Sequence, residues 1–115
     1  MKAPITAILL LLAASGADAA CVRPGAAPTV PNGAQADEET MKQAHDAIQA
    51  HVNQLEGYKA CLKKQAETAP SDVGQELALT WLAQGDAAVD SANYLANQFS
   101  AALKRFKERN QTSTQ

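Results

Sequence analysis

The fold is decided at residues 67–72, which read Glu67-Thr68-Ala69-Pro70-Ser71-Asp72. Pro70 disfavours helical geometry at the residue before it, so a helix that reaches this point is predicted to end. Ser71 or Asp72 can cap a new helix, and with Asp72 as the cap, Gln75 falls at the third position of a capping box. Long apolar patterns lie on both sides of this break. We therefore predict an all-α fold, an antiparallel two-helix hairpin over residues 37–109.

The first helix is predicted to begin at Asp37. Asp37 can cap the free backbone amides, and Glu38 and Glu39 are placed favourably at the positive end of the helix dipole. The apolar residues that follow recur in steps of three or four, at Met41, Ala44, Ile48, Val52, Leu55, Tyr58, Leu62 and Ala66. This period of about 3.5 residues is typical of a helix that packs along its whole length, as in a coiled coil.

The second helix is predicted to follow the break. Its apolar face contains Leu77, Trp81, Ala88, Ala92, Leu95, Phe99, Leu103 and Phe106. Leu82, Val89 and Ala96 widen this face, which is therefore broader than the first helix alone can cover. Gly74 and Gly85 are expected to lie within the helix, where they weaken it slightly but permit the close approach of a neighbour.

The last turns of the second helix are basic. They contain Lys104, Arg105, Lys107 and Arg109. Cations at this position complement the negative end of the helix dipole. Lys104, Arg105 and Lys107 are also a candidate surface for binding an anionic lipid or a cell-envelope polymer. Residues 110–115 are expected to form a flexible tail.

Residues 20–36 form a proline-rich segment, which we call the strap. Its prolines are Pro24, Pro28 and Pro31. They favour an extended path, and Asn32-Gly33 predicts a turn. The helix from Asp37 to Cys61 rises about 36 Å, and the strap that begins at Cys21 can reach about 46 Å. A Cys21–Cys61 disulfide can therefore close only if the strap runs antiparallel along most of the first helix.

Residues 1–19 have the pattern of an export signal. Lys2 gives a positive start, an apolar run follows from Ile5 to Ala14, and Ala17-Asp18-Ala19 offers a cleavage site before Ala20, with cleavage after Ala17 as an alternative. The apolar run of about 10 residues is well short of the ~20 needed to span a bilayer. An exported chain, periplasmic or secreted, meets an oxidising compartment in which two cysteines are expected to form a disulfide.

Lipidation of Cys21 is the alternative to this disulfide. Lipoproteins carry a lipidated N-terminal cysteine, and the small residues Ala19 and Ala20 fit such a site, whereas Asp18 stands where Leu is favoured. Lipidation would also leave Cys61 as an unpaired thiol in an oxidising space. The disulfide is therefore the favoured prediction.

These features together resemble a family of small exported bacterial proteins with a proline-rich strap, a cysteine pair and a helical hairpin. The resemblance rests on Cys21, Pro31-Asn32-Gly33, Glu38-Glu39, Met41 and Tyr58-Lys59-Ala60-Cys61-Leu62. It covers roughly half of the mature chain, because the second helix matches only in general character. The resemblance implies a compartment and an architecture, and it implies no catalytic activity.

Few patterns in the sequence carry chemistry. His45 and His51 are six residues apart, whereas a metal pair on one helix needs a spacing of three or four. Met41 and His45 have that spacing and are an alternative copper pair, although Met41 fits the core and His45 a solvated edge. The cysteines are forty residues apart, not in a Cys-x-x-Cys redox motif, and no serine lies in a Gly-x-Ser-x-Gly context. We therefore predict a protein that is not an enzyme and binds no metal or cofactor.

Composition limits the partners. The net charge is −2, so no basic excess points to nucleic acid. About 95 residues remain after cleavage, which is enough for one small domain. The favoured function is a non-enzymatic periplasmic module that binds another protein or itself, with Tyr94 a candidate contact. The alternative is a cell-envelope or anionic-surface binding protein, including a lipoprotein.

Overall fold

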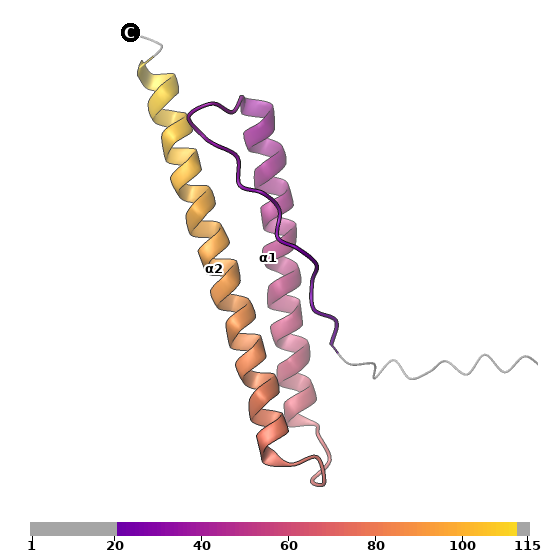
Figure 1. Cartoon of the computed structure of the whole chain (residues 1–115). Coiled ribbons are helices and arrows are strands. Elements are labelled where there is room, and N and C mark those ends of the chain that lie inside the picture. Colours follow the sequence, from indigo (N-terminus) through magenta and orange to yellow (C-terminus); the bar gives the residue numbers. More distant parts are fainter. Residues whose placement is uncertain (1–20, 113–115) are drawn as a thin grey trace, which may run out of the picture.

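The computed structural model describes residues 21–112, which form a two-helix hairpin (Figure 1). The elements are α1 (Glu38–Glu67) and α2 (Gln75–Thr112), which pack against each other along their lengths. No strand occurs within residues 21–112. The predicted all-α antiparallel hairpin is therefore confirmed. The predicted signal peptide, residues 1–19, lies outside the described residues.

The start of α1 is confirmed as predicted. Asp37 Oδ1 accepts a hydrogen bond from the backbone amide of Thr40 at 2.8 Å, and Glu38 and Glu39 occupy the first turn. Hydrogen bonds from Thr40 hold the pKa of the Asp37 carboxyl below its ordinary value of 3.8. The bond with the Thr40 side chain has the largest effect, followed by the bond with the Thr40 backbone amide. The cap is therefore charged at neutral pH, where it complements the positive end of the helix dipole.

The other end of α1 closes before Pro70, as the sequence predicts. Thr68 is the C-cap, and its backbone amide and its hydroxyl both donate to the Lys64 carbonyl, at 2.9 and 2.7 Å. This pairing satisfies a carbonyl that has no partner within the helix.

α2 begins at Gln75, later than a cap at Ser71 or Asp72 requires, so that prediction is wrong. A turn over residues 70–73 intervenes, and a backbone hydrogen bond of 3.0 Å joins its first and last residues. Gly74 follows with a φ of 79°, in the left-handed region that glycine adopts readily. Gly74 therefore lies in the loop, not inside the helix as predicted.

α2 also continues further than predicted, since it includes residues 110–112, which we assigned to the tail. The neighbouring Arg109 is tied to the strap, because its guanidinium donates to the carbonyls of Ala34, at 2.9 Å, and Ala36. These bonds hold the last turns of α2 in place. The rest of the predicted tail lies outside the described residues.

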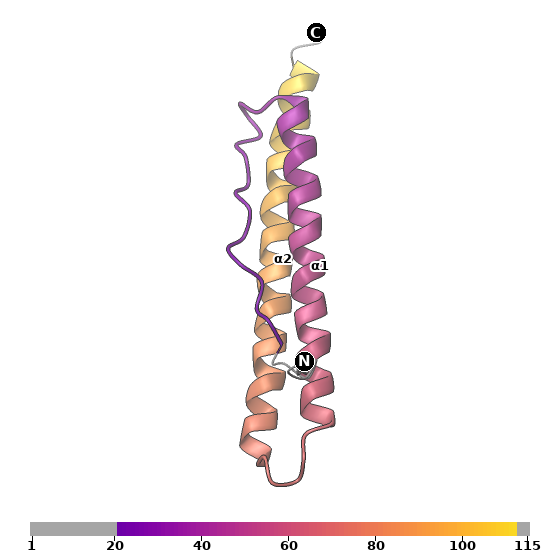
Figure 2. The same ribbon diagram turned by 90° about the vertical axis from the view of Figure 1, so that its right-hand side faces the viewer.

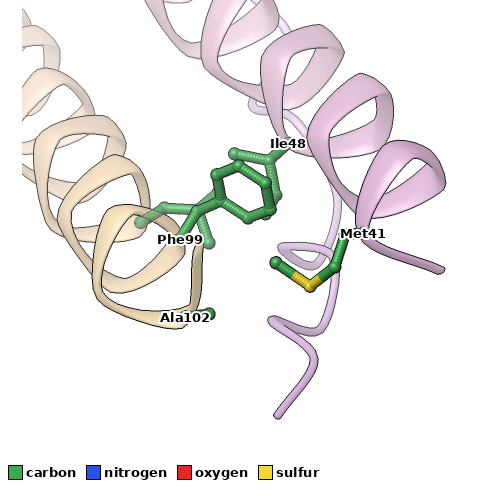
Figure 3. Packing of buried hydrophobic residues seen from close by; sticks show 5 residues of the cluster. Met41, Ile48, Phe99 and Ala102 are labelled. Atoms are coloured by element: carbon green, nitrogen blue, oxygen red, sulfur yellow. The ribbon is translucent and has the colours of Figure 1, made fainter. Parts of the chain in front are cut away.

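The core is a seam in which buried positions recur every seven residues. In α1 they are Met41, Ile48, Leu55 and Leu62. In α2 they form two rows, Ala88, Leu95 and Ala102 in the first and Ala92 and Phe99 in the second. Figure 3 shows side chains of α1 and α2 meeting in this seam. This spacing is that of a coiled coil, and the alanines allow the two helices to lie close together.

Gly85 brings the two helices together nearer the loop. It is buried, and a Cβ at this position would lie 3.1 Å from Cγ of Lys59. The predicted role of Gly85 in close approach is confirmed.

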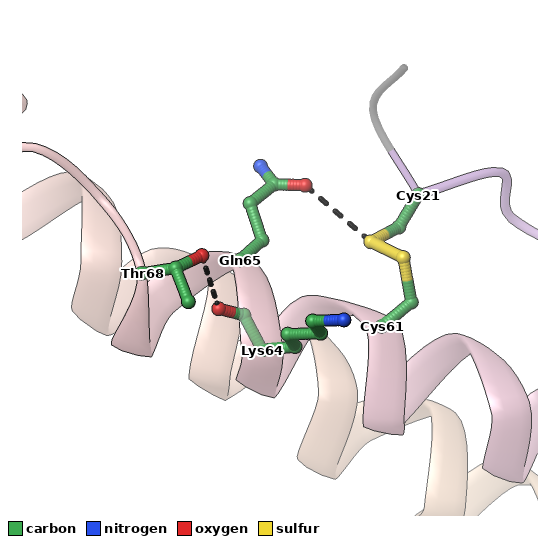
Figure 4. The surroundings of a disulfide bond; sticks show 5 residues. All are labelled: Cys21, Cys61, Lys64, Gln65 and Thr68. Atoms are coloured by element: carbon green, nitrogen blue, oxygen red, sulfur yellow. Dashed lines mark hydrogen bonds between the residues drawn. A yellow bond between two sulfur atoms is a disulfide. The ribbon is translucent and has the colours of Figure 1, made fainter. Parts of the chain in front are cut away.

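The strap runs back along one side of the hairpin, from the later turns of α1 towards its start (Figures 1 and 2). It lies over the groove between the helices, where strap residues share a hollow with Leu55 and Tyr58 of α1 and with Ala88 and Ser91 of α2. A disulfide joins Cys21 to Cys61, with their Cα atoms 5.7 Å apart (Figure 4). The antiparallel strap and its staple are therefore confirmed.

The other end of the strap is held by a turn, as Asn32-Gly33 predicts. The Asn32 carbonyl accepts hydrogen bonds from the backbone amides of Gln35 and Ala36, at 3.0 and 2.9 Å. Gly33 is buried so tightly against α2 that an added Cβ would lie 1.8 Å from the carbonyl oxygen of Ala102. The strap is thus fixed at both ends, by a covalent bond and by close packing.

Candidate functional site

The seam of the hairpin has two sides, and the strap covers one of them. We call the covered side the strap face and the other the open face. Two rows of α2 residues flank the buried rows, one on each side of the seam. The residues of each row also recur every seven positions, so each row stays on its own side along the helix. The strap-face row is polar and consists of Gln84, Ser91, Gln98 and Arg105. The open-face row is apolar and consists of Leu82, Val89, Ala96 and Leu103.

Contacts of the strap identify which row it covers. Ala27 and Pro28 line a hollow together with Ser91 and Gln98, and other strap residues line a second hollow with Gln84. The strap therefore lies against the polar row. The apolar row is the one left without a covering segment among the described residues.

The open-face row remains accessible to solvent. Leu82 exposes 38% of its surface and Ala96 is exposed, while Val89 and Leu103 are half-buried. The prediction that the apolar face of α2 is wider than α1 can cover is confirmed. Because contiguous apolar surface marks interaction sites more often than scattered apolar residues do, this row is the candidate site.

α1 contributes a more polar row to the open face. It consists of His45, Val52, Lys59 and Ala66. Lys59 Nζ lies 3.3 Å from Asp86 Oδ1 of α2 and bridges the two helices at the edge of this face. Val52 packs against both clusters of the core, which places it near the middle of the hairpin.

At the end of the hairpin that lies away from the loop between α1 and α2, the open face is hollowed. The hollow is lined by Glu38, Met41, Lys42, His45, Asp46, Phe99, Leu103 and Phe106. The ring of His45 lies 5.8 Å from that of Phe99, and its Nδ1 lies 3.3 Å from the carboxylate of Asp46. The hollow is therefore apolar at its base and charged at its rim.

The alternative copper pair does not form a site here. Met41 is 4% exposed and packs in the core beside Ile48 and Phe99, while His45 is exposed at the edge. His51 is half-buried two turns further along α1. Within residues 21–112, no group of three or more His, Cys, Asp or Glu side chains is placed to hold a metal ion.

The predicted basic site is only partly brought together. Lys104 and Lys107 line one hollow next to Leu103. Arg105 lies roughly 160° around α2 from Lys107, because two residues separate them in a helix. The three cations therefore do not form one surface.

Arg109 has a role that sequence reasoning missed. We assigned it to the helix dipole, but it also binds the strap carbonyls of Ala34 and Ala36, and its guanidinium lies 5.4 Å from the ring of Phe106. Seventy-five residues separate Arg109 from Ala34. No local spacing in the sequence signals such a contact.

The Cys21–Cys61 disulfide uses the sulfur atom that lipidation of Cys21 would need. Gln65 Oε1 lies 3.4 Å from Cys21 Sγ (Figure 4). Since a disulfide sulfur carries no proton, this is a polar contact and not a donated hydrogen bond. The staple indicates an oxidising environment outside the cytoplasm.

Tyr94 exposes 66% of its surface at the edge of the strap face. It lines the same hollow as Pro28 and Val30, so the ring borders the strap. Its predicted contact with a partner stays a prediction.

No protein-family model, curated protein or solved structure matches this chain. Neither helix in the described part of the chain is both long enough and apolar enough to cross a bilayer.

Proposed function

We propose that this chain is a non-enzymatic, exported helical protein that acts as a protein-interaction module in the periplasm, held in shape by its disulfide-stapled strap. The observation that carries this proposal is the apolar row of α2 on the open face. An interaction surface needs apolar side chains at its centre and polar groups around them. Leu82, Val89, Ala96 and Leu103 supply the first, and Lys59 and Asp86 are part of the second.

Export is proposed from two independent features. The first 19 residues have the pattern of a cleaved signal peptide. The Cys21–Cys61 disulfide supports an oxidising compartment, since such bonds rarely persist in the cytosol. We also propose a resemblance to small exported bacterial proteins, carried by residues such as Cys21, Met41 and Cys61, and it agrees with both features.

The proposal is tested by a photo-crosslinking amino acid placed at position 96 of the protein in the cells that export it. Position 101 is the matched control, because Ala101 is also an exposed alanine of α2 and lies about 140° around the helix from Ala96. We expect covalent protein adducts from position 96 and not from position 101. Adducts from neither position, or equally from both, would contradict the proposal.

Binding to an anionic envelope surface through Lys104, Arg105 and Lys107 is the weaker proposal. Lys104 and Lys107 lie together, but Arg105 lies on another side of α2. Salt-sensitive binding to vesicles of anionic lipid, lost in a Lys104→Gln and Lys107→Gln double variant, would support it. Binding that survives this change would exclude these residues.

A further inference from the structure

We propose that the partner on the open face is a second copy of this chain, which packs its α2 antiparallel to the first α2 and completes a four-helix bundle. This inference rests on the proposed function and specifies its partner. The two straps would lie on the outer sides of the bundle. Spacing, charge and area each point to this occupant.

The seven-residue spacing of the apolar row fits a helix of similar length as the partner. Residues at seven-residue intervals pack against another helix along their whole run. In an antiparallel pair of α2 helices centred between residues 92 and 93, Leu82 of each copy lies level with Leu103 of the other, and Val89 with Ala96. The row is therefore self-complementary, which a symmetric dimer interface needs.

The same centre places Val52 of α1 on the twofold axis. Lys59 and Asp86 are paired across the seam, so α1 residues lie level with α2 residues whose numbers add to about 145. The centre of the α2 pair, between residues 92 and 93, then lies level with the point between Val52 and Asn53 of α1. Val52 is on the open face and packs against both core clusters. The two Val52 side chains would meet in the dimer.

Charge determines the direction of the pair. The only charged residues of α2 before position 101 are the acidic Glu76, Asp86 and Asp90. After position 101, Lys104 and Lys107 lie beside Leu103 of the open face, whereas Arg105 belongs to the strap-face row and Arg109 binds the strap. An antiparallel pair therefore sets the acidic end of one α2 against the basic end of the other, twice, whereas a parallel pair would set like charges together.

The area of the open face is sufficient for a dimer. From Ala78 to Lys107, α2 is about 45 Å long, and two helices side by side are about 20 Å wide. Such a face would bury about 900 Å² on each copy, against about 800 Å² in a typical stable complex. Because the strap covers the other face, association would stop at two copies.

The first experiment measures the mass of the mature, oxidised protein by sedimentation velocity over a range of concentrations. We expect the mass of two chains at about 10 µM and dissociation on dilution. Ala96→Glu would place a charge in the interface of both copies, and we expect it to raise the dissociation constant about a hundredfold. Ala101→Glu makes the same change outside the interface and should leave the constant within about threefold. Equal effects of the two changes would overturn the proposal.

A second experiment tests the geometry. Val52→Cys, in the chain that keeps its Cys21–Cys61 bond, should form a covalent dimer on mild oxidation, with a 52–52 linkage found by peptide mapping. Ala101→Cys should not. Failure of Val52→Cys to cross-link would overturn the proposed register.

The failure of this inference can be distinguished from the failure of the proposed function. A strict monomer at about 1 mM would overturn self-association. If position 96 then still cross-links to a different protein in cells, the interaction module stands with another partner. If it cross-links to nothing, both proposals fail.

Discussion

Gly33 lies where the strap turns over the backbone of α2, and a Cβ there would lie 1.8 Å from the Ala102 carbonyl oxygen. Because this neighbour is backbone, it cannot move aside as a flexible side chain would. We expect Gly33→Ala to lower the free energy of unfolding by about 1 to 3 kcal/mol, measured by urea unfolding of the oxidised protein. Gly25→Ala is the control, since nothing lies within 4 Å of its Cβ position. An equal loss in both variants would contradict the packing of Gly33.

Asp37 gives the molecule a predictable response to acid. Hydrogen bonding to Thr40 lowers the pKa of Asp37 in the folded protein below its ordinary value of 3.8. A lowered folded pKa contributes stability that is present above the unfolded value and is lost as the pH falls through the folded value. We therefore expect Asp37→Ala to lower the Tm at pH 7, and its difference from wild type to shrink below about pH 4.

Asp37→Asn separates the two contributions of this residue. Asparagine also caps helices, but its side chain does not ionise. The variant should have a Tm close to that of the wild type at pH 7. It should lack the part of the Tm decrease at low pH that comes from protonation of Asp37. If the Tm of the wild type and of Asp37→Asn decreased equally as the pH falls, the attribution of this pH dependence to Asp37 would be contradicted.

At the scale of elements, the strap depends on the disulfide at one end and on packing at the other. The chain between Cys21 and Cys61 spans 40 residues, and closing such a loop contributes about 4 kcal/mol in the chain-entropy model. We expect the Cys21→Ser and Cys61→Ser double variant to lose about this much free energy of unfolding.

Hydrogen exchange of the same double variant tests how the strap is held. Residues 22–29 are nearest the lost bond and should exchange faster. Residues 33–36 should keep their protection, because Gly33 remains packed on Ala102 and Arg109 still binds the carbonyls of Ala34 and Ala36. Uniform loss of protection over the whole strap would show that the disulfide alone holds it.

At the scale of the whole molecule, a dimer should make thermal stability depend on concentration. A partner that binds only the folded chain stabilises it by mass action. We expect the Tm of the wild type and of Ala101→Glu to rise with protein concentration and the Tm of Ala96→Glu to rise less. A wild-type Tm that is independent of concentration would contradict association through the open face. The readout is calorimetry over a hundredfold range of concentration, roughly the range that shifts a dimer equilibrium by 2.7 kcal/mol.

Much of the hairpin was accessible from the sequence because it depends on neighbours three or four residues apart. The cap at Asp37, the rows at Met41 and Ile48, and the end of α1 before Pro70 all follow from helix periodicity and local backbone rules. The start of α2 was misplaced because Ser71 and Asp72 offered a plausible cap. The turn over residues 70–73, which Gly74 follows, competes with this cap, and capping patterns do not include that competition.

By itself, the sequence determined two helices, the break between them and the pairing of its only two cysteines, because short-range geometry and chain reach settle these features. Only the tertiary structure decided which side of α2 the strap covers. The disulfide at Cys61 and the packing of Gly33 on Ala102 hold the strap over Ser91 and Gln98, which leaves Leu82 and Ala96 exposed. The contacts of Arg109 and Gly33 were also beyond reach, since each joins segments about seventy residues apart whose register arises only when the hairpin closes.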